Sequence, residues 1–207
     1  HHPSSAASDV YKRQNIIYHT TPHRGLELLV PIMDWIEEQM PDINWHLDVY
    51  SSFGIYGWEE RDKPYEGLFK RIKDHPRMTY HGHVPNKEVH KALQKAHIFA
   101  LPSIWPETSC IALIEAMSAG CICVHSSLAA LPETAANWTL MYDHTEDGQE
   151  HANRHALTLA DAIRFADNDN MKERLNMQKA FVDGYYSWEV RQKQWEVFLT
   201  SILSNHG

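Results

Sequence analysis

The alternation of short β-type runs with helical segments is the feature that most restricts the fold of this 207-residue chain. Six runs rich in branched and aromatic residues have the length and the flanking turn residues of strands. They are residues 15–19, 45–52, 78–84, 97–103, 121–125 and 139–143. Strands that alternate with helices at this spacing form βαβ units and a parallel sheet. We therefore predict an α/β fold, a Rossmann-like parallel sheet with helices on both faces.

Helices are predicted over residues 21–40, 86–96 and about 109–119, and again from residue 150 to 203 with breaks near 167–170 and 184–187. In the first of them a threonine is placed to cap the helix, and apolar side chains recur at the spacing of one helix face. Those side chains are Leu26, Leu29, Ile32, Met33 and Ile36. Near the end of the chain, Trp188 and Trp195 are seven residues apart, which predicts a core-facing stripe.

Composition narrows the class of protein. The net charge is −8 and no Lys/Arg-rich run is present, which argues against nucleic acid or an anionic membrane surface as the main target. No apolar stretch reaches the ~18 residues that a membrane-spanning helix needs. The three cysteines lie in the most apolar segment, which indicates reduced, buried thiols and a cytoplasmic location. We interpret the polar, aperiodic residues 1–14 as a tag-like or non-native leader, and residues 15–207 as one domain.

Two carboxylates mark the most apolar segment, PSIWPETSCIALIEAMSAGCICV. A helix that begins at the carboxyl end of a parallel strand offers free N–H groups to an anion, and Thr108, Ser109 and Cys110 are small enough to let a ligand approach them. Glu107, just before this helix, and Glu115, inside it, would repel phosphate but suit hydroxyl groups. Amides for phosphate together with carboxylates for hydroxyls are what a nucleotide-sugar requires.

The same segment closely resembles the E-x7-E signature of retaining GT-B glycosyltransferases of family 4. The resemblance extends over roughly residues 15–203. It includes YHTTPHRGLELL, with a basic residue before Gly, MTYHGHVPNKEVHKALQKAHIFALPS, and the Trp-containing FVDGYYSWEVRQKQWEVFL near the end. Enzymes of this family have two Rossmann-like domains, and the chain resembles only the second, donor-binding one. We therefore expect the acceptor domain to be absent.

The resemblance implies a role for each matching position. Glu115 would hold the ribose hydroxyls of the donor, and Glu107 would contact the donor sugar. The amides of residues 108–111, ending at Ile111, would meet the sugar and the diphosphate. Arg24 would neutralise the diphosphate as it leaves. The base would lie near His83 and Val84 and be read mostly through backbone.

Two positions depart from the family. His19 stands where the family often has a second basic residue, and a neutral His19 would weaken the stabilisation of the diphosphate. Ala129-Ala130 stands where Gly-Gly often precedes the L-P-E stretch. Cys110 could act as a nucleophile, but the interpretation that it is a small residue which lets the ligand approach is favoured. His81 and His83, on one face of the predicted strand, lack a third metal ligand at suitable spacing, so we predict no metal site.

We therefore expect the donor-binding half of a retaining hexosyltransferase that uses a UDP- or GDP-sugar, requires no other cofactor, and is incomplete as an enzyme alone. The acceptor, a sugar, lipid or polysaccharide, is not encoded in these residues. In the full-length enzyme we expect a cytoplasmic protein that can lie at the inner face of the membrane, and a homodimer through the exposed inter-domain face is a further expectation. Two alternatives remain open, a nucleotide-sugar 2-epimerase-like GT-B domain and a non-catalytic Rossmann-like assembly module.

Overall fold

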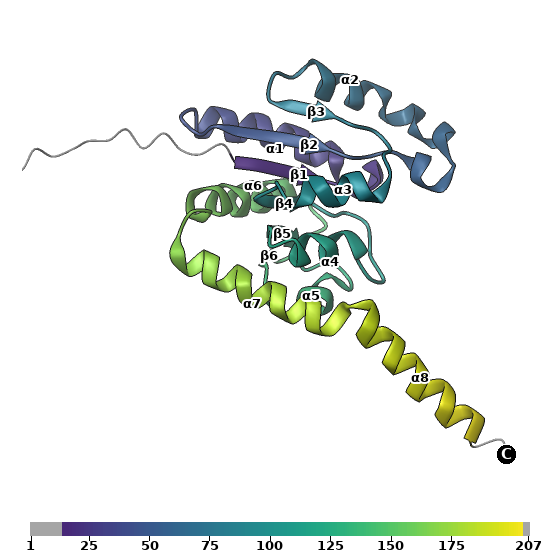
Figure 1. Ribbon diagram of the computed structural model, residues 1–207. Helices are drawn as coiled ribbons and strands as arrows, with labels where there is room; N and C mark the ends of the chain where they lie inside the picture. Colours follow the sequence, from purple (N-terminus) through teal and green to yellow (C-terminus); the bar gives the residue numbers. More distant parts are fainter. Residues whose placement is uncertain (1–13, 205–207) are drawn as a thin grey trace, which may run out of the picture.

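The computed structural model describes residues 14–204, which form a six-stranded, all-parallel sheet in the order β3-β2-β1-β4-β5-β6 (Figure 1). The strands are β1 Gln14–Tyr18, β2 Trp45–Val49, β3 Met78–Tyr80, β4 Ile98–Leu101, β5 Ile122–Ser126 and β6 Leu140–Tyr142. The central strands are buried on both faces, because helices cover each side of the sheet. The predicted Rossmann-like α/β fold is confirmed.

Helices and short 3-10 turns connect the strands. They are η1 Pro22–Arg24, α1 Leu26–Gln39, η2 Phe53–Tyr56, η3 Glu59–Tyr65, α2 Glu66–Asp74, α3 Asn86–Leu93, α4 Ile111–Ser118, α5 Leu131–Ala135, α6 Gly148–Phe165, α7 Asp169–Tyr186 and α8 Trp188–Ser204. From β1 to β3 the chain moves across the sheet in one direction, and from β3 to β6 it moves in the other. Because crossovers between parallel strands are right-handed, α1 and α2 lie on one face of the sheet and α3 and α4 on the other. α6 packs beside α1, and α7 packs beside α4 (Figure 1).

The predicted face of α1 is confirmed, because all five of its apolar residues are buried. Its predicted threonine cap is wrong. The helix begins at Leu26 with Gly25 as its N-cap, and the preceding residues form the separate turn η1. The third strand is also shorter than predicted. It ends at Tyr80, so His81 and His83 do not share a strand face, and Gly82 between them has a φ of +66°.

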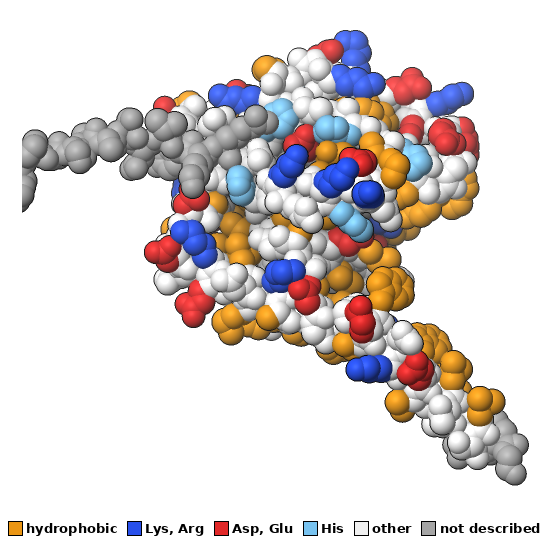
Figure 2. All heavy atoms as spheres, in the orientation of Figure 1, with side chains coloured by type: hydrophobic (Ala, Val, Ile, Leu, Met, Phe, Trp, Pro, Cys, Tyr) orange, Lys and Arg blue, Asp and Glu red, His pale blue; other side chains and the backbone are white. Residues whose placement is uncertain are grey.

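The C-terminal third is helical, and both predicted breaks are confirmed. The core-facing stripe is wrong, since Trp188 and Trp195 are 87% and 60% exposed and no residue of α8 is buried. α8 leads away from the sheet, and Figure 2 shows hydrophobic side chains along it. The spacing of apolar residues along a helix shows that one of its faces is apolar. It does not show whether the core of the domain packs against that face.

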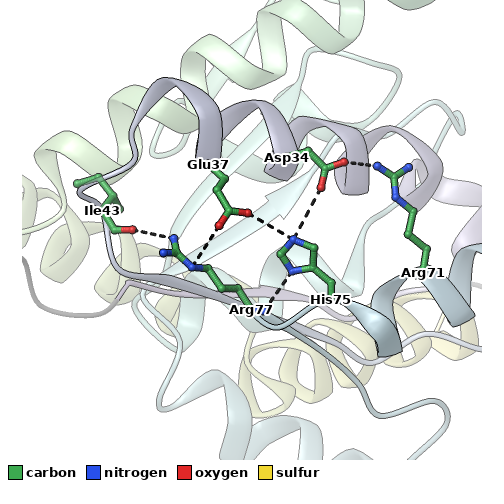
Figure 3. A network of polar contacts seen from close by, with 6 residues as sticks. All are labelled: Asp34, Glu37, Ile43, Arg71, His75 and Arg77. Carbon is green, nitrogen blue, oxygen red and sulfur yellow. Dashed lines mark hydrogen bonds and ion pairs between the residues drawn. The ribbon is translucent and has the colours of Figure 1, made fainter.

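A polar network joins α1 to the segment before β3 (Figure 3). The ring of His75 lies 3.4 Å from Glu37 and 3.9 Å from Asp34, Arg77 lies 3.5 Å from Glu37, and Arg71 pairs with Asp34. These residues precede β3 and therefore lie at the amino edge of the sheet. They support the fold at the edge opposite to the carboxyl ends of the strands.

Residues 1–13 of the predicted leader lie outside the described residues, and Gln14, its last residue, begins β1 opposite Trp45. Among residues 14–204 no helix combines the length and the apolar character needed to cross a membrane. All three cysteines fall in the described range, where they are buried, as predicted, and form no disulfide.

Candidate functional site

The carboxyl ends of β1 and β4 meet at the centre of the sheet. The two strands are neighbours, with Ile16 opposite Ile98 and Ile17 opposite Phe99, although two strands and three helices lie between them in the chain. The strand order reverses at this point, and open α/β sheets bind their ligands in the crevice that such a reversal creates. The loop after β1 carries Arg24, and the loop after β4 carries Glu107.

Gly25 allows these two loops to approach each other. Its φ is +114°, a left-handed conformation that favours glycine. A Cβ atom there would lie 2.1 Å from the carbonyl oxygen of Pro102, so any larger residue would collide with backbone. The glycine after Arg24 is therefore required by the contact between the loops.

Arg24 and Glu107 form an ion pair across the gap. Arg24 Nε lies 3.0 Å from Glu107 Oε1, and Arg24 Nη1 donates to Thr20 Oγ1 at 2.8 Å. The Glu107 side chain is only 5% exposed. Burial raises the pKa of its carboxyl, and the neighbouring guanidinium acts in the opposite direction. Arg24 Nε and Glu107 Oε1 are both buried, and within residues 14–204 neither has a contact of hydrogen-bond geometry, so the attraction between the opposite charges holds the pair together.

Glu115 lies one turn inside α4 and faces two imidazoles. His90 Nε2, from α3, is 3.1 Å from Glu115 Oε1, and His19 Nδ1, at the end of β1, is 3.9 Å from Oε2. α4 begins at Ile111, two residues later than predicted, with Cys110 as its N-cap and no capping side chain. The amides of its first turn are therefore available to an anion, and the helix dipole favours one.

Six of the predicted residues line one cavity of about 230 Å³. They are His19, Arg24, His83, Val84, Ile111 and Glu115. The remaining four do not line it. Glu107 is buried beside Arg24, Thr108 and Ser109 are exposed in the approach to α4, and Cys110 is buried beneath them.

The cavity is lined by two charged side chains of opposite sign, Arg24 and Glu115. Burial lowers the pKa of His19 to about 4, so this ring is neutral at pH 7. Arg24 is then the single Lys or Arg among the described residues that line the cavity. Burial raises the pKa of the Cys110 thiol to about 11, which leaves it protonated and unsuited to act as a nucleophile.

Residues 17–168 match the family described as Glycosyl transferases group 1. This chain belongs to that family. Over 136 residues it is 26% identical to a human protein that is named as one of the subunits of phosphatidylinositol N-acetylglucosaminyltransferase. The match covers 63% of this chain and 26% of the human protein.

Two solved structures have the same fold as this group 1 glycosyl transferase domain. A glycosyltransferase from Rickettsia africae matches with a TM-score of 0.73 at 14% identity, over 93% of this chain and 48% of that one. The Anabaena protein HepE, in complex with UDP and glucose, matches with a TM-score of 0.63 at 16% identity, over 91% of this chain and 48% of that one. The chain thus spans about half the length of these structures and about a quarter of the human protein.

The departure at Ala129-Ala130 has a structural explanation in this group 1 domain. Ala129 has a φ of +51°, in the left-handed region where glycine is favoured, so the backbone that Gly-Gly would suit is kept with alanine. The next amide, of Ala130, donates to the carbonyl oxygen of Glu107 at 3.2 Å. This strained turn therefore helps to hold the Glu107 loop in place.

Sequence reasoning missed part of the cavity wall. Tyr50 and Ser52 follow β2, and Ile55 and Tyr56 belong to η2. The rule that ligands meet the carboxyl ends of strands would have indicated the first two. For Ile55 and Tyr56 no sequence signal existed, because η2 has no periodic pattern and its position depends on the hydrogen bonds of Ser52 and Phe53 to Asp62.

Proposed function

We propose that this chain is the donor-binding half of a retaining glycosyltransferase, which transfers a hexosyl group from a nucleotide-diphosphate-sugar to an acceptor. The observation that carries the proposal is the placement of Glu115, Arg24 and the open end of α4 around one cavity at the reversal of strand order. The UDP and glucose in HepE, a protein of the same fold, support a sugar nucleotide as the ligand class. The human relative, named for N-acetylglucosaminyl transfer, supports a hexosyl group.

Each charged group suits one part of such a donor. The Glu115 carboxylate accepts hydrogen bonds from the ribose hydroxyls, and Glu107 accepts one from the donor sugar. The diphosphate, more highly charged than a carboxylate, competes with Glu107 for Arg24 and also meets the first-turn amides of α4. The base lies against the backbone of Gly82, His83 and Val84, which leaves few side chains to choose among bases.

The chemistry asked of this half is mainly electrostatic. The bond between the anomeric carbon and the diphosphate oxygen breaks as negative charge develops on the diphosphate. The α4 amides stabilise that charge, and Arg24 does so once it exchanges Glu107 for the diphosphate. The proposal assigns no side-chain nucleophile to this domain, in agreement with the protonated thiol of Cys110.

The acceptor is expected to require chain beyond these residues. The described domain corresponds to about half of the matched structures, and the cavity opens to solvent beside exposed Ile55 and Tyr56. We therefore propose that this chain alone binds the nucleotide and transfers little or no sugar. A transfer rate comparable to that of two-domain relatives would contradict this part of the proposal.

A thermal-shift titration with UDP, GDP and ADP tests the donor site. A ligand at 100 times its dissociation constant adds about 2.7 kcal/mol, which for a domain of this size raises Tm by roughly 5–10 °C. We expect a shift with one nucleotide, abolished in Glu115→Ala and retained in the control Glu88→Ala. Glu88 suits this purpose because it is an exposed acid of α3, ion-paired with Lys91 and outside the cavity.

The two alternatives give different outcomes. A non-catalytic assembly module predicts no shift with any of the three nucleotides, and this result would refute the donor site. An epimerase-like domain also binds a sugar nucleotide, but it converts the sugar into its epimer. Analysis of the products formed from a UDP-sugar, after the chain is joined to an acceptor domain, separates it from a transferase.

A further inference from the structure

Glu115 receives a hydrogen bond from a residue that has no role in the donor site proposed above. His90 lies on α3, and its Nε2 is 3.1 Å from Glu115 Oε1. This is the only side-chain hydrogen bond to Glu115 among the described residues. The second carboxylate oxygen lies 3.9 Å from His19, which is beyond hydrogen-bond distance. One oxygen is thus fixed, and the other remains able to accept.

Fixing this carboxylate matters because of where it stands. Glu115 lines the donor cavity and also a second hollow of about 700 Å³, which His90 lines as well. Lys179 of that hollow is already engaged, because its ammonium group donates to the Ser118 carbonyl oxygen and to Asp183, both at 2.7 Å. A glutamate side chain with a free choice of rotamers would divide its time between the cavity and the hollow. Ordering it only when the ligand arrives would cost affinity.

His90 is not needed for the fold. Its side chain is 54% exposed, whereas α3 is anchored to the core by the buried Leu93. Its ring faces Glu115 from outside the apolar core, so shortening it leaves no cavity. Its interaction with Glu115 can therefore be removed without unfolding the domain.

We propose that His90 is a positioning residue, which fixes Oε1 of the Glu115 carboxylate so that Oε2, on the side of His19 and the donor cavity, accepts hydrogen bonds from a vicinal ribose diol. This inference rests on the proposed donor site. The ligand class that it concerns is a ribonucleoside diphosphate with free 2′ and 3′ hydroxyls. His90 itself touches no ligand atom, and it acts through Glu115.

The test measures dissociation constants by calorimetry for UDP, GDP and ADP, and then for the 2′,3′-dideoxy form of the one that binds. For the ribonucleotide we expect His90→Ala to weaken binding about five- to tenfold, because the Glu115 side chain must then be ordered when the ligand binds. His90→Gln keeps an N–H donor and should recover most of the affinity. For the dideoxy nucleotide His90→Ala should have no effect, because Glu115 then has no diol to accept from.

The controls separate this inference from the proposed function. Lys91→Ala, the next residue on α3, should leave both dissociation constants unchanged, and all variants should keep the wild-type Tm without ligand. If wild type binds none of the nucleotides, the donor site and this inference are both refuted. If Glu115→Ala abolishes binding but His90→Ala does not change it, the donor site stands and the positioning role is refuted. An equal loss for the ribo and dideoxy forms would also refute it, since that pattern indicates a general structural effect.

Discussion

Three buried histidines should make this domain unusually sensitive to mild acid. His125 lies between the carbonyl oxygen of Ser126 and the hydroxyl of Thr139, both at 2.8 Å, and its ring is fully buried. His155 is also fully buried, and His19 ends β1 beneath the donor cavity. Burial lowers their pKa values from 6.5 to about 4 for His19 and His125 and to about 3 for His155.

The direction of this pH dependence follows from whether the folded or the unfolded chain binds the protons. Between pH 6.5 and about 4 the unfolded chain protonates these rings and the folded chain does not, so the free energy of unfolding falls as the pH falls. The stabilisation is complete above pH 6.5 and is lost progressively below it. At pH 5 each ring lowers the free energy of unfolding by about 2 kcal/mol, and the three together lower it by about 6 kcal/mol. His151 adds to the trend, and Glu107, whose pKa is raised by burial, opposes it.

A loss of about 6 kcal/mol is comparable to the total stability of many domains, typically about 5–15 kcal/mol. Urea unfolding followed by circular dichroism at pH 7, 6 and 5 measures it, provided the m-value stays constant. We expect His155→Gln to remove about 2 kcal/mol of the pH 7 to 5 difference. If the free energy of unfolding of the wild type falls by less than about 2 kcal/mol between pH 7 and pH 5, the prediction is refuted, because the three rings are then not held neutral by burial.

Further changes test the geometry of the site. Gly25→Ala should lower the free energy of unfolding by about 3 kcal/mol or more, because the new Cβ would meet Pro102 backbone at 2.1 Å. Gly57→Ala, with a φ of +71° and open space around it, controls for the positive φ alone, and an equal loss in both would refute the contact argument. Arg24→Met should destabilise the fold by about 3 kcal/mol, since it leaves Glu107 buried without its partner. Adding Glu107→Gln should restore urea stability but not the nucleotide thermal shift, and recovery of both would argue against Arg24 as the diphosphate ligand.

The sequence patterns that were interpreted correctly are those set by local physics. Apolar spacing placed α1, and short branched runs placed the strands, because burial of one face or of both faces follows directly from period and composition. The motif around Glu107 and Glu115 led to the carboxyl edge of the sheet, where six of the ten predicted residues share one cavity. These features depend on neighbours in the chain or on a motif of fixed spacing.

What the sequence did not reveal depends on contacts between distant segments. His90 comes from a polar helix, and nothing in that helix indicates that Glu115 lies 3.1 Å away. The ion pair of Arg24 with Glu107 likewise requires that β1 and β4 be adjacent. Trp188 and Trp195 were misplaced for a related reason, since their exposure is decided by the direction in which α8 leaves α7.

The adjacency of β1 and β4 also determines when the proposed donor cavity can form during synthesis. Arg24 emerges early, but Glu107 and Glu115 follow only after β2, β3, α3 and β4. Closing so long a segment between paired strands is slow compared with forming local structure. A nascent chain that ends before α4 therefore contains a partial sheet without a ligand site, and a nucleotide can begin to stabilise the domain only after α4 has docked.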